Sequence, residues 1–103
     1  MTLSKEQIKT RVRENIDRMP HKEYIQKLSL FGSYLHGNPT DESDVDILIE
    51  FTPNSPIGFF QLSHMLRSME DTLGKRVDLV TPQALSKYFR DDVLSESEKI
   101  YEK

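Results

Sequence analysis

Residues 44–51 constrain the fold of this chain more than any other stretch. They read Asp-Val-Asp-Ile-Leu-Ile-Glu-Phe, and the length and the β-branched and aromatic content of this run predict a buried strand. Side chains alternate between the two faces of a strand, so Asp44 and Asp46 should share one face while Val45 and Ile47 occupy the other. Neighbouring carboxylates on one face repel each other unless a cation lies between them. Because the nearby ligands are all oxygen atoms, with no Cys or His, the pattern favours Mg2+ over zinc.

A glycine–serine pair lies ten residues before this strand. Residues 27–31 predict another strand, and Ser33 is placed to cap a short helix over residues 34–36. Gly32 would let a phosphate approach the backbone, and the N–H groups of a helix start, together with a serine hydroxyl, can bind it. A phosphate-binding turn beside metal-binding carboxylates is typical of proteins that catalyse phosphoryl or nucleotidyl transfer.

Length and composition limit the possible classes of protein. The 103 residues, of which 36% are hydrophobic and 30% charged, predict a single globular domain over residues 1–103 with a modest core. We expect no membrane span and no signal peptide, because every apolar run is short, and we expect a cytoplasmic protein. The absence of Cys excludes disulfides and thiolate metal sites. The net charge of −3, without a Lys/Arg block, argues against direct binding to nucleic acid.

The remaining residues predict helices around the strands. A capping box at residues 4–7 should start a helix that Pro20 ends. A second helix should begin near residues 55–56 and stop at Gly74, and its core face is expected to contain Phe59, Phe60, Leu62, Met65, Leu66, Met69 and Leu73. Residues 75–80 predict a third strand. We expect a final helical region from residue 81, with a possible break at residues 91–92 and a charged tail over residues 95–103.

The two motifs together resemble a known family. Residues 31–33 (Phe-Gly-Ser) and 44–46 (Asp-Val-Asp) match the signature of the DNA polymerase β-like nucleotidyltransferase superfamily. The small size is similar to its minimal nucleotidyltransferase (MNT) branch, and in particular to the MntA-type antitoxins of HEPN/MNT toxin–antitoxin systems. The resemblance extends from residue 27 to the end of the chain. It implies an α/β (α+β) fold in which a small mixed β-sheet is flanked by helices.

The resemblance also implies roles for individual residues. Asp44, Asp46 and Asp78 would be the catalytic metal ligands for two Mg2+ ions, and Asp78 would also activate the acceptor. Gly32 and Ser33, with Asp44 and Asp46, would bind the nucleotide. Without the resemblance, we would interpret Asp78 as a strand residue paired with Arg76 or Lys75, its neighbours along residues 75–80.

One position departs from the family pattern. Related proteins often carry an Arg shortly after the Gly-Ser pair, where this chain has His36. Arginine is permanently charged and bidentate, whereas histidine is mostly neutral near pH 7. His36 in place of Arg therefore predicts weaker or pH-sensitive binding of the triphosphate.

The resemblance implies an enzyme that transfers AMP from ATP to a hydroxyl on a cognate HEPN ribonuclease toxin and thereby neutralises it, and the expected acceptor is a Tyr hydroxyl. A catalytic core of this size should need a partner chain or a second copy, so a hetero-oligomer with the toxin is expected. Tyr88, Phe89 and Tyr101 are candidates for that interface, although each could equally pack in the core. Two alternatives stay open: an antitoxin that acts by binding alone, and a catalytic subunit that modifies a small molecule or an RNA end.

Overall fold

A four-stranded mixed β-sheet forms the centre of the computed structural model, which describes residues 2–103. Its strands are β1 (Ile25–Phe31), β2 (Val45–Phe51), β3 (Val77–Val80) and β4 (Glu98–Glu102), in the order β3-β2-β1-β4. Strand β1 runs antiparallel to both β2 and β4, whereas β2 and β3 are parallel. The predicted α/β (α+β) class, with a small mixed sheet flanked by helices, is confirmed.

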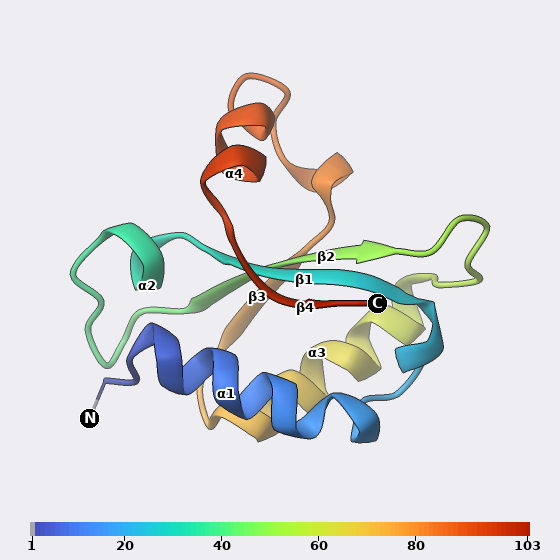
Figure 1. Ribbon diagram of the computed structural model, residues 1–103, viewed down its shortest axis with the longest axis horizontal. Coiled ribbons are helices and arrows are strands. Elements are labelled where there is room, and N and C mark those ends of the chain that lie inside the picture. The colour runs from blue at the N-terminus through green and yellow to red at the C-terminus, as the bar shows by residue number, and fades with distance from the viewer. Residues whose placement is uncertain (1) are drawn as a thin grey trace.

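Two helices, α1 (Lys5–Asn15) and α3 (Phe59–Leu73), cover one face of the sheet (Figure 1). The core lies between them and the strands, because the apolar side chains of β2 and β3 alternate onto this face. It contains Ile8, Val12, Leu28, Leu30, Val45, Ile47, Ile49, Met65, Met69, Leu73, Val77, Leu79 and Ile100, among others. The alternation that buries Val45, Ile47 and Val77 turns Asp46 and Asp78 toward the opposite face.

The start of α1 confirms the predicted capping box. The Ser4 hydroxyl accepts a hydrogen bond from the Gln7 backbone N–H at 3.1 Å, and the Gln7 side chain accepts one from the Ser4 N–H at 2.8 Å. These reciprocal bonds satisfy two N–H groups that a helix start otherwise leaves unpaired. The α-helix ends at Asn15, and a 3-10 turn (Ile16–Arg18) leads toward Pro20.

The prediction for the start of α3 is wrong in part. The helix begins at Phe59, after Gly58, rather than near residues 55–56. Phe59 and Phe60 are 77% and 74% exposed and contact each other edge to face, so neither belongs to the core. The predicted core face holds farther along, where Met65, Met69 and Leu73 are buried.

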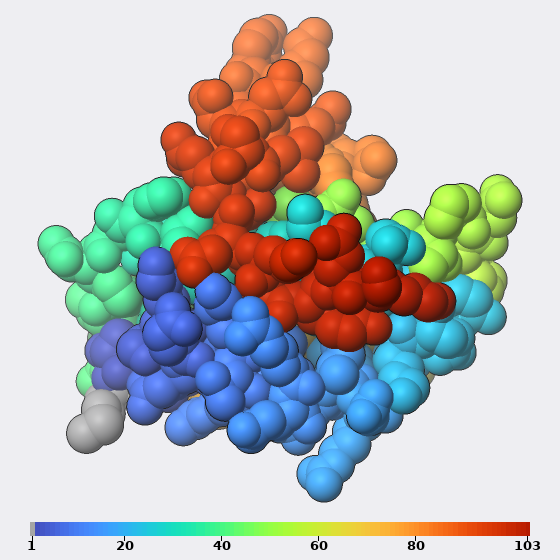
Figure 2. Space-filling model, in the orientation of Figure 1, coloured from blue at the N-terminus to red at the C-terminus, as the bar shows by residue number. Residues whose placement is uncertain are grey.

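The C-terminal region differs most from its prediction. After β3 the chain leaves the sheet as residues 81–97, which we name the arch; it contains a 3-10 turn (Pro82–Ala84) and α4 (Arg90–Glu96). The arch stands out from the body of the molecule, on the side of the sheet opposite α1 and α3 (Figures 1 and 2). The expected charged tail is instead strand β4, which pairs with β1 at the edge of the sheet.

Hydrogen bonds from the Arg90 guanidinium hold the arch together. Arg90 donates hydrogen bonds to the carbonyl oxygens of Pro82 at 2.8 Å and Leu85 at 2.9 Å. These bonds join the start of α4 to the beginning of the arch.

Within residues 2–103, none of the helices is both long and apolar enough to cross a bilayer.

Candidate active site

The sheet register brings the two sequence motifs together. Asp46 of β2 lies opposite Phe31, the last residue of β1, on one side and opposite Asp78 of β3 on the other. Gly32 follows Phe31 directly, so the glycine–serine turn reaches the same end of the sheet. Asp44 lies just before β2, two residues from Asp46, and is near enough for its negative charge to act on Asp46. The structure therefore places all three predicted carboxylates beside the glycine–serine turn.

Asp46 is the most perturbed of these carboxylates. Burial raises its pKa from 3.8 to about 6, and the negative charges of Asp78 and Asp44 add to that rise. A raised pKa means that the ionised form of the carboxylate is destabilised in the folded protein. A bound cation would stabilise that ionised form. Such a perturbation at a cluster of acidic side chains is a common mark of a functional site.

Gly32 is shaped to receive the Asp46 side chain. Its φ of +79° and ψ of −153° lie in a region that is essentially restricted to glycine. A Cβ atom at this position would overlap the carboxylate of Asp46. The sequence predicts only a phosphate-binding role for this glycine, but its first role in the fold is to leave room for Asp46.

Ser33 does not cap the short helix as predicted. It is the first residue of α2 (Ser33–His36), and Gly32 occupies the cap position without a side-chain hydrogen bond. The N–H groups of Leu35 and His36 already donate to the Gly32 carbonyl oxygen, at 3.0 and 3.1 Å. The N–H groups of Ser33 and Tyr34, at the very start of the helix, are therefore the ones that could bind an anion. Ser33 thus stays a candidate for nucleotide binding through both its hydroxyl and this helix start.

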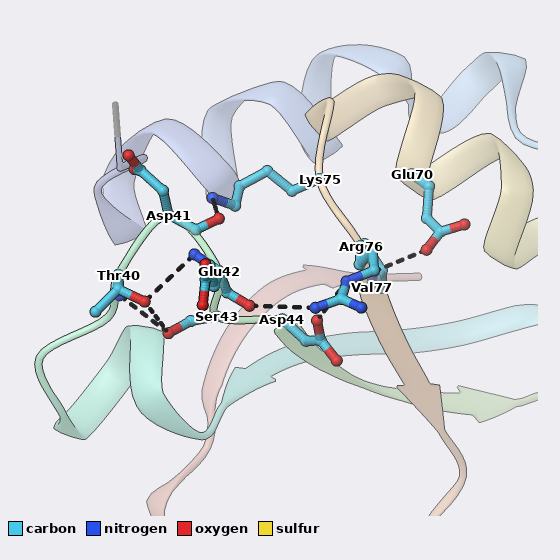
Figure 3. A network of polar contacts seen from close by, with 9 residues as sticks. All are labelled: Thr40, Asp41, Glu42, Ser43, Asp44, Glu70, Lys75, Arg76 and Val77. Carbon is cyan, nitrogen blue, oxygen red and sulfur yellow. Dashed lines mark hydrogen bonds and ion pairs between the residues drawn. The ribbon is translucent and has the colours of Figure 1, made fainter.

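Arg76 pairs with Asp44 rather than with Asp78. Its Nε lies 3.1 Å from Asp44 Oδ1, and its Nη2 donates to the Glu42 carbonyl oxygen at 3.3 Å (Figure 3). The neighbouring Lys75 donates to the Asp41 carbonyl oxygen at 2.9 Å. Asp78 is exposed, and within residues 2–103 its carboxylate accepts no hydrogen bond and forms no ion pair, so it is free to act. The alternative interpretation of Asp78, as the ion-pair partner of Arg76 or Lys75, is not what the structure shows.

Sequence reasoning missed the contact between Arg76 and Asp44. Both residues come immediately before their strands, and Val45 donates its N–H to the Arg76 carbonyl oxygen at 3.0 Å. The parallel pairing of Val45 with Val77 therefore places their preceding residues side by side. The signal was the parallel register, which the sequence of either strand does not contain.

His36, the departure from the family pattern, faces the arch. Its Nε2 lies 3.7 Å from Glu96 Oε2, a contact that is an ion pair only when the imidazole is protonated. Both side chains are more than half exposed. The contact joins α2 to α4 on the side of the sheet that carries the carboxylates.

The donor set fits a divalent cation, although the side chains do not yet surround one. All three carboxylates offer oxygen atoms, the ligands that Mg2+ prefers, and burial, with repulsion by Asp78 and Asp44, raises the pKa of Asp46. In residues 2–103, however, no three His, Cys, Asp or Glu side chains converge on one position as metal ligands do.

A groove of about 490 Å³ lies elsewhere, between the end of α1 and the exposed side of α3. Its lining includes Arg18, His64 and Arg67 but none of the predicted site residues. It belongs to the helix layer, whereas the carboxylates occupy the other face of the sheet. The size of this groove therefore does not make it a better candidate for the active site than the carboxylate cluster.

The chain is similar over most of its length to known nucleotidyltransferases. The profile of the Polymerase beta, Nucleotidyltransferase family matches residues 14–103. A protein from Methanocaldococcus jannaschii, provisionally described as a protein adenylyltransferase, is 34% identical over 79 residues, which are 77% of this chain and 79% of that protein. The protein adenylyltransferase MntA of Thermococcus cleftensis is 37% identical over 73 residues, covering 70% of this chain and 71% of the relative.

Solved structures share the fold. One, provisionally described as a minimal nucleotidyltransferase, superimposes with a TM-score of 0.73 at 26% identity and covers 92% of this chain and 94% of its own. Another belongs to a complex of the tri-AMPylated HEPN toxin of Shewanella oneidensis with an MNT antitoxin. It has a TM-score of 0.64 at 18% identity and covers 95% of this chain and 72% of its own.

Proposed function

Because this chain belongs to the Polymerase beta nucleotidyltransferase family, we propose that it transfers AMP from ATP to a hydroxyl of a HEPN-type toxin and thereby neutralises that toxin. The observation that carries the proposal is the meeting of Asp44, Asp46 and Asp78 beside the Gly32–Ser33 turn. The T. cleftensis relative is named as a protein adenylyltransferase, and the fold recurs in a complex with an AMP-bearing HEPN toxin; both support this acceptor.

We assign the three carboxylates as the metal ligands. Asp44 and Asp46 would hold two Mg2+ ions, and Asp78 would complete the ligands of one of them. When bound, the ions lower the pKa of the acceptor hydroxyl and neutralise the charge of the triphosphate and of the departing pyrophosphate. The protein contributes the positions of these oxygen atoms and a sheet end that fixes them relative to the turn.

The remaining steps use the chain's own groups. The N–H groups of Ser33 and Tyr34 and the Ser33 hydroxyl would hold the β- and γ-phosphates. The acceptor oxygen forms a bond to the α-phosphorus, the bond from that phosphorus to the bridging oxygen breaks, and pyrophosphate leaves. The acceptor's proton passes to Asp78, whose carboxylate is exposed. A tyrosine hydroxyl of the toxin is the proposed acceptor, and a reaction that consumes ATP points to the cytoplasm as its place.

The test is transfer of label from α-labelled ATP, with Mg2+, to a purified HEPN-type partner. The double variant Asp44→Asn/Asp46→Asn should lose the label. A matched control, Glu14→Gln/Glu23→Gln, removes the same charge from exposed positions outside the site and should keep it. Label that survives in the first variant would refute the assignment of the site. A tight complex that silences the toxin without label would favour an antitoxin that acts by binding alone, and neither label nor complex would favour a small-molecule or RNA acceptor.

A further inference from the structure

Arg76 occupies the position of a cation beside one of the proposed metal ligands. Its Nε lies 3.1 Å from Asp44 Oδ1, which is an ion-pair distance. A second bond, from its Nη2 to the Glu42 carbonyl oxygen at 3.3 Å, anchors the guanidinium to the loop before β2. Figure 3 shows the Asp44 side chain directed at this guanidinium.

The ion pair between Arg76 and Asp44 is weak enough to be displaced. The side chain of Arg76 is 76% exposed and that of Asp44 is 47% exposed, so water screens their attraction. A divalent ion carries twice the charge and binds the same oxygen directly, so it should win this competition once its other ligands are in place. The exchange would also free Asp44 to turn toward Asp46.

We infer that Arg76 is a replaceable counter-ion of Asp44, which a divalent cation must displace before the metal site forms. The inference rests on the proposed function, because it takes Asp44 as a metal ligand. It explains why no three ligands converge within residues 2–103 although three carboxylates lie close together. It also predicts the size of an effect: removing the Arg76 side chain should strengthen cation binding more than the loss of its positive charge alone explains.

Lys75 provides the matched control. It carries the same charge one residue earlier, but its ammonium bonds to the carbonyl oxygen of Asp41 and lies 5.9 Å from the centre of the Tyr34 ring. Replacing Lys75 therefore removes one positive charge near the site without releasing the side chain of Asp44. The difference between the two variants isolates the contact from the general field.

The experiment is a titration of the nucleotide-free protein with Mn2+, followed by the electron paramagnetic resonance signal of the free ion. We expect Arg76→Gln to bind Mn2+ about fivefold more tightly than the native protein, and Lys75→Gln to differ from it by less than about twofold. In an Asp44→Asn background, Arg76→Gln should change the affinity by less than about twofold, as Lys75→Gln does, since the pair is already gone and only the general field of the charge remains. Equal effects of Arg76→Gln and Lys75→Gln, or weaker binding by Arg76→Gln, would overturn the inference.

A second titration, with ATP present, separates this inference from the proposed function. If the native protein binds Mn2+ with ATP but Arg76→Gln shows no gain without it, Arg76 is not a competing counter-ion, and the proposed metal site stands. If Mn2+ fails to bind under either condition, and Asp44→Asn/Asp46→Asn behaves like the native protein, both the metal site and the role of Arg76 are wrong.

Discussion

At residue 32, the absence of a side chain decides where a neighbouring carboxylate can lie. Gly32 combines a positive φ with direct proximity to the Asp46 side chain, whereas Gly74 has a positive φ with no heavy atom within 4 Å of an added Cβ. The two glycines therefore separate backbone strain from overlap with a functional group.

Gly32→Ala should lose both stability and AMP transfer. The backbone strain alone costs about 1–3 kcal/mol, and the new Cβ would also force the Asp46 carboxylate away from its place. Gly74→Ala should lose about 1–2 kcal/mol of stability, because Gly74 has a left-handed backbone, and should keep its transfer activity. Thermal unfolding and the label-transfer assay measure the two effects. Full activity in a folded Gly32→Ala protein would contradict the role given to this contact.

Asp46 should make the protein less stable as the pH rises. Its pKa is raised to about 6 in the folded state, so the folded protein binds the proton more tightly than the unfolded chain does. The free energy of unfolding should therefore fall between about pH 4 and about pH 6 and stay lower above that range. Because the side chain is partly exposed, screening reduces the effect to about 1 kcal/mol.

Asp46→Asn should then be more stable than the native protein at about pH 7.5 and close to it at about pH 4. The measurement is the melting temperature at both pH values, with a chelator present to remove divalent ions. Glu14→Gln, which removes an exposed carboxylate on α1, should show no such pH-dependent gain. An Asp46→Asn protein that melts below the native protein at both pH values would contradict the electrostatic origin of the cost.

The site was more predictable than its contacts. Two acidic residues at a spacing of two, on an apolar run, already place both carboxylates on one face of a strand, and the structure keeps Asp46 there. The sequence could not show that Asp44 pairs with Arg76, because that contact depends on the register between β2 and β3. The role of Gly32 against Asp46 was hidden for the same reason: it depends on the pairing of β1 with β2.

At the scale of elements, the first helix and the last strand hold each other in place. Glu98 at the start of β4 accepts hydrogen bonds from Lys9 at 2.6 Å and Lys5 at 3.1 Å, both on α1. Arg13, farther along α1, donates to the Ile100 carbonyl oxygen at 2.6 Å. This ladder of basic side chains explains how a charged segment becomes an edge strand.

Glu98→Ala should destabilise the protein by about 1–3 kcal/mol, because it leaves the buried Lys9 ammonium without its partner. Glu102→Ala, which breaks only an exposed pair with Lys99, should cost at most about 1 kcal/mol. The hydrogen bonds from Lys9 and Lys5 lower the pKa of Glu98, so its contribution is present above the ordinary value of 4.5. The difference between native and Glu98→Ala proteins should therefore shrink as the pH falls through the lowered pKa. Urea unfolding at neutral and acidic pH measures it, and equal losses in the two variants would contradict the argument.

The elements that sequence reasoning predicted best are those with local signals. The capping box at residues 4–7 and the alternating run of β2 are written in adjacent residues. Strand β4 was missed because Glu-Lys-Ile-Tyr-Glu has little strand propensity of its own and forms by pairing with β1. Phe59 matched the helical period but lies in the first turn of α3, where it is 77% exposed rather than packed in the core.

At the scale of the whole molecule, the two faces of the sheet have different uses. One is filled by α1, α3 and the core, and the other carries the carboxylates and the arch. Tyr88 is 84% exposed and Phe89 is also exposed, in agreement with their candidacy for an interface. Tyr101, the third candidate, is partly buried and packs against the core.

A protein acceptor must approach the carboxylate face for its hydroxyl to be modified, so the arch is the apolar surface that it should meet. We therefore expect Tyr88→Ser/Phe89→Ser to weaken binding of the HEPN-type partner by about tenfold or more, because exposed aromatic side chains often dominate interfaces. Phe59→Ser/Phe60→Ser is the matched control: it removes an equally exposed aromatic pair from the start of α3, in the helix layer, and should leave binding within about twofold. Since both pairs are exposed, neither change should lower the melting temperature appreciably, and titration calorimetry can compare the two affinities directly. If the α3 pair proved the more important, the partner would approach from the helix layer, and the acceptor hydroxyl would have to reach Asp78 around the edge of the sheet.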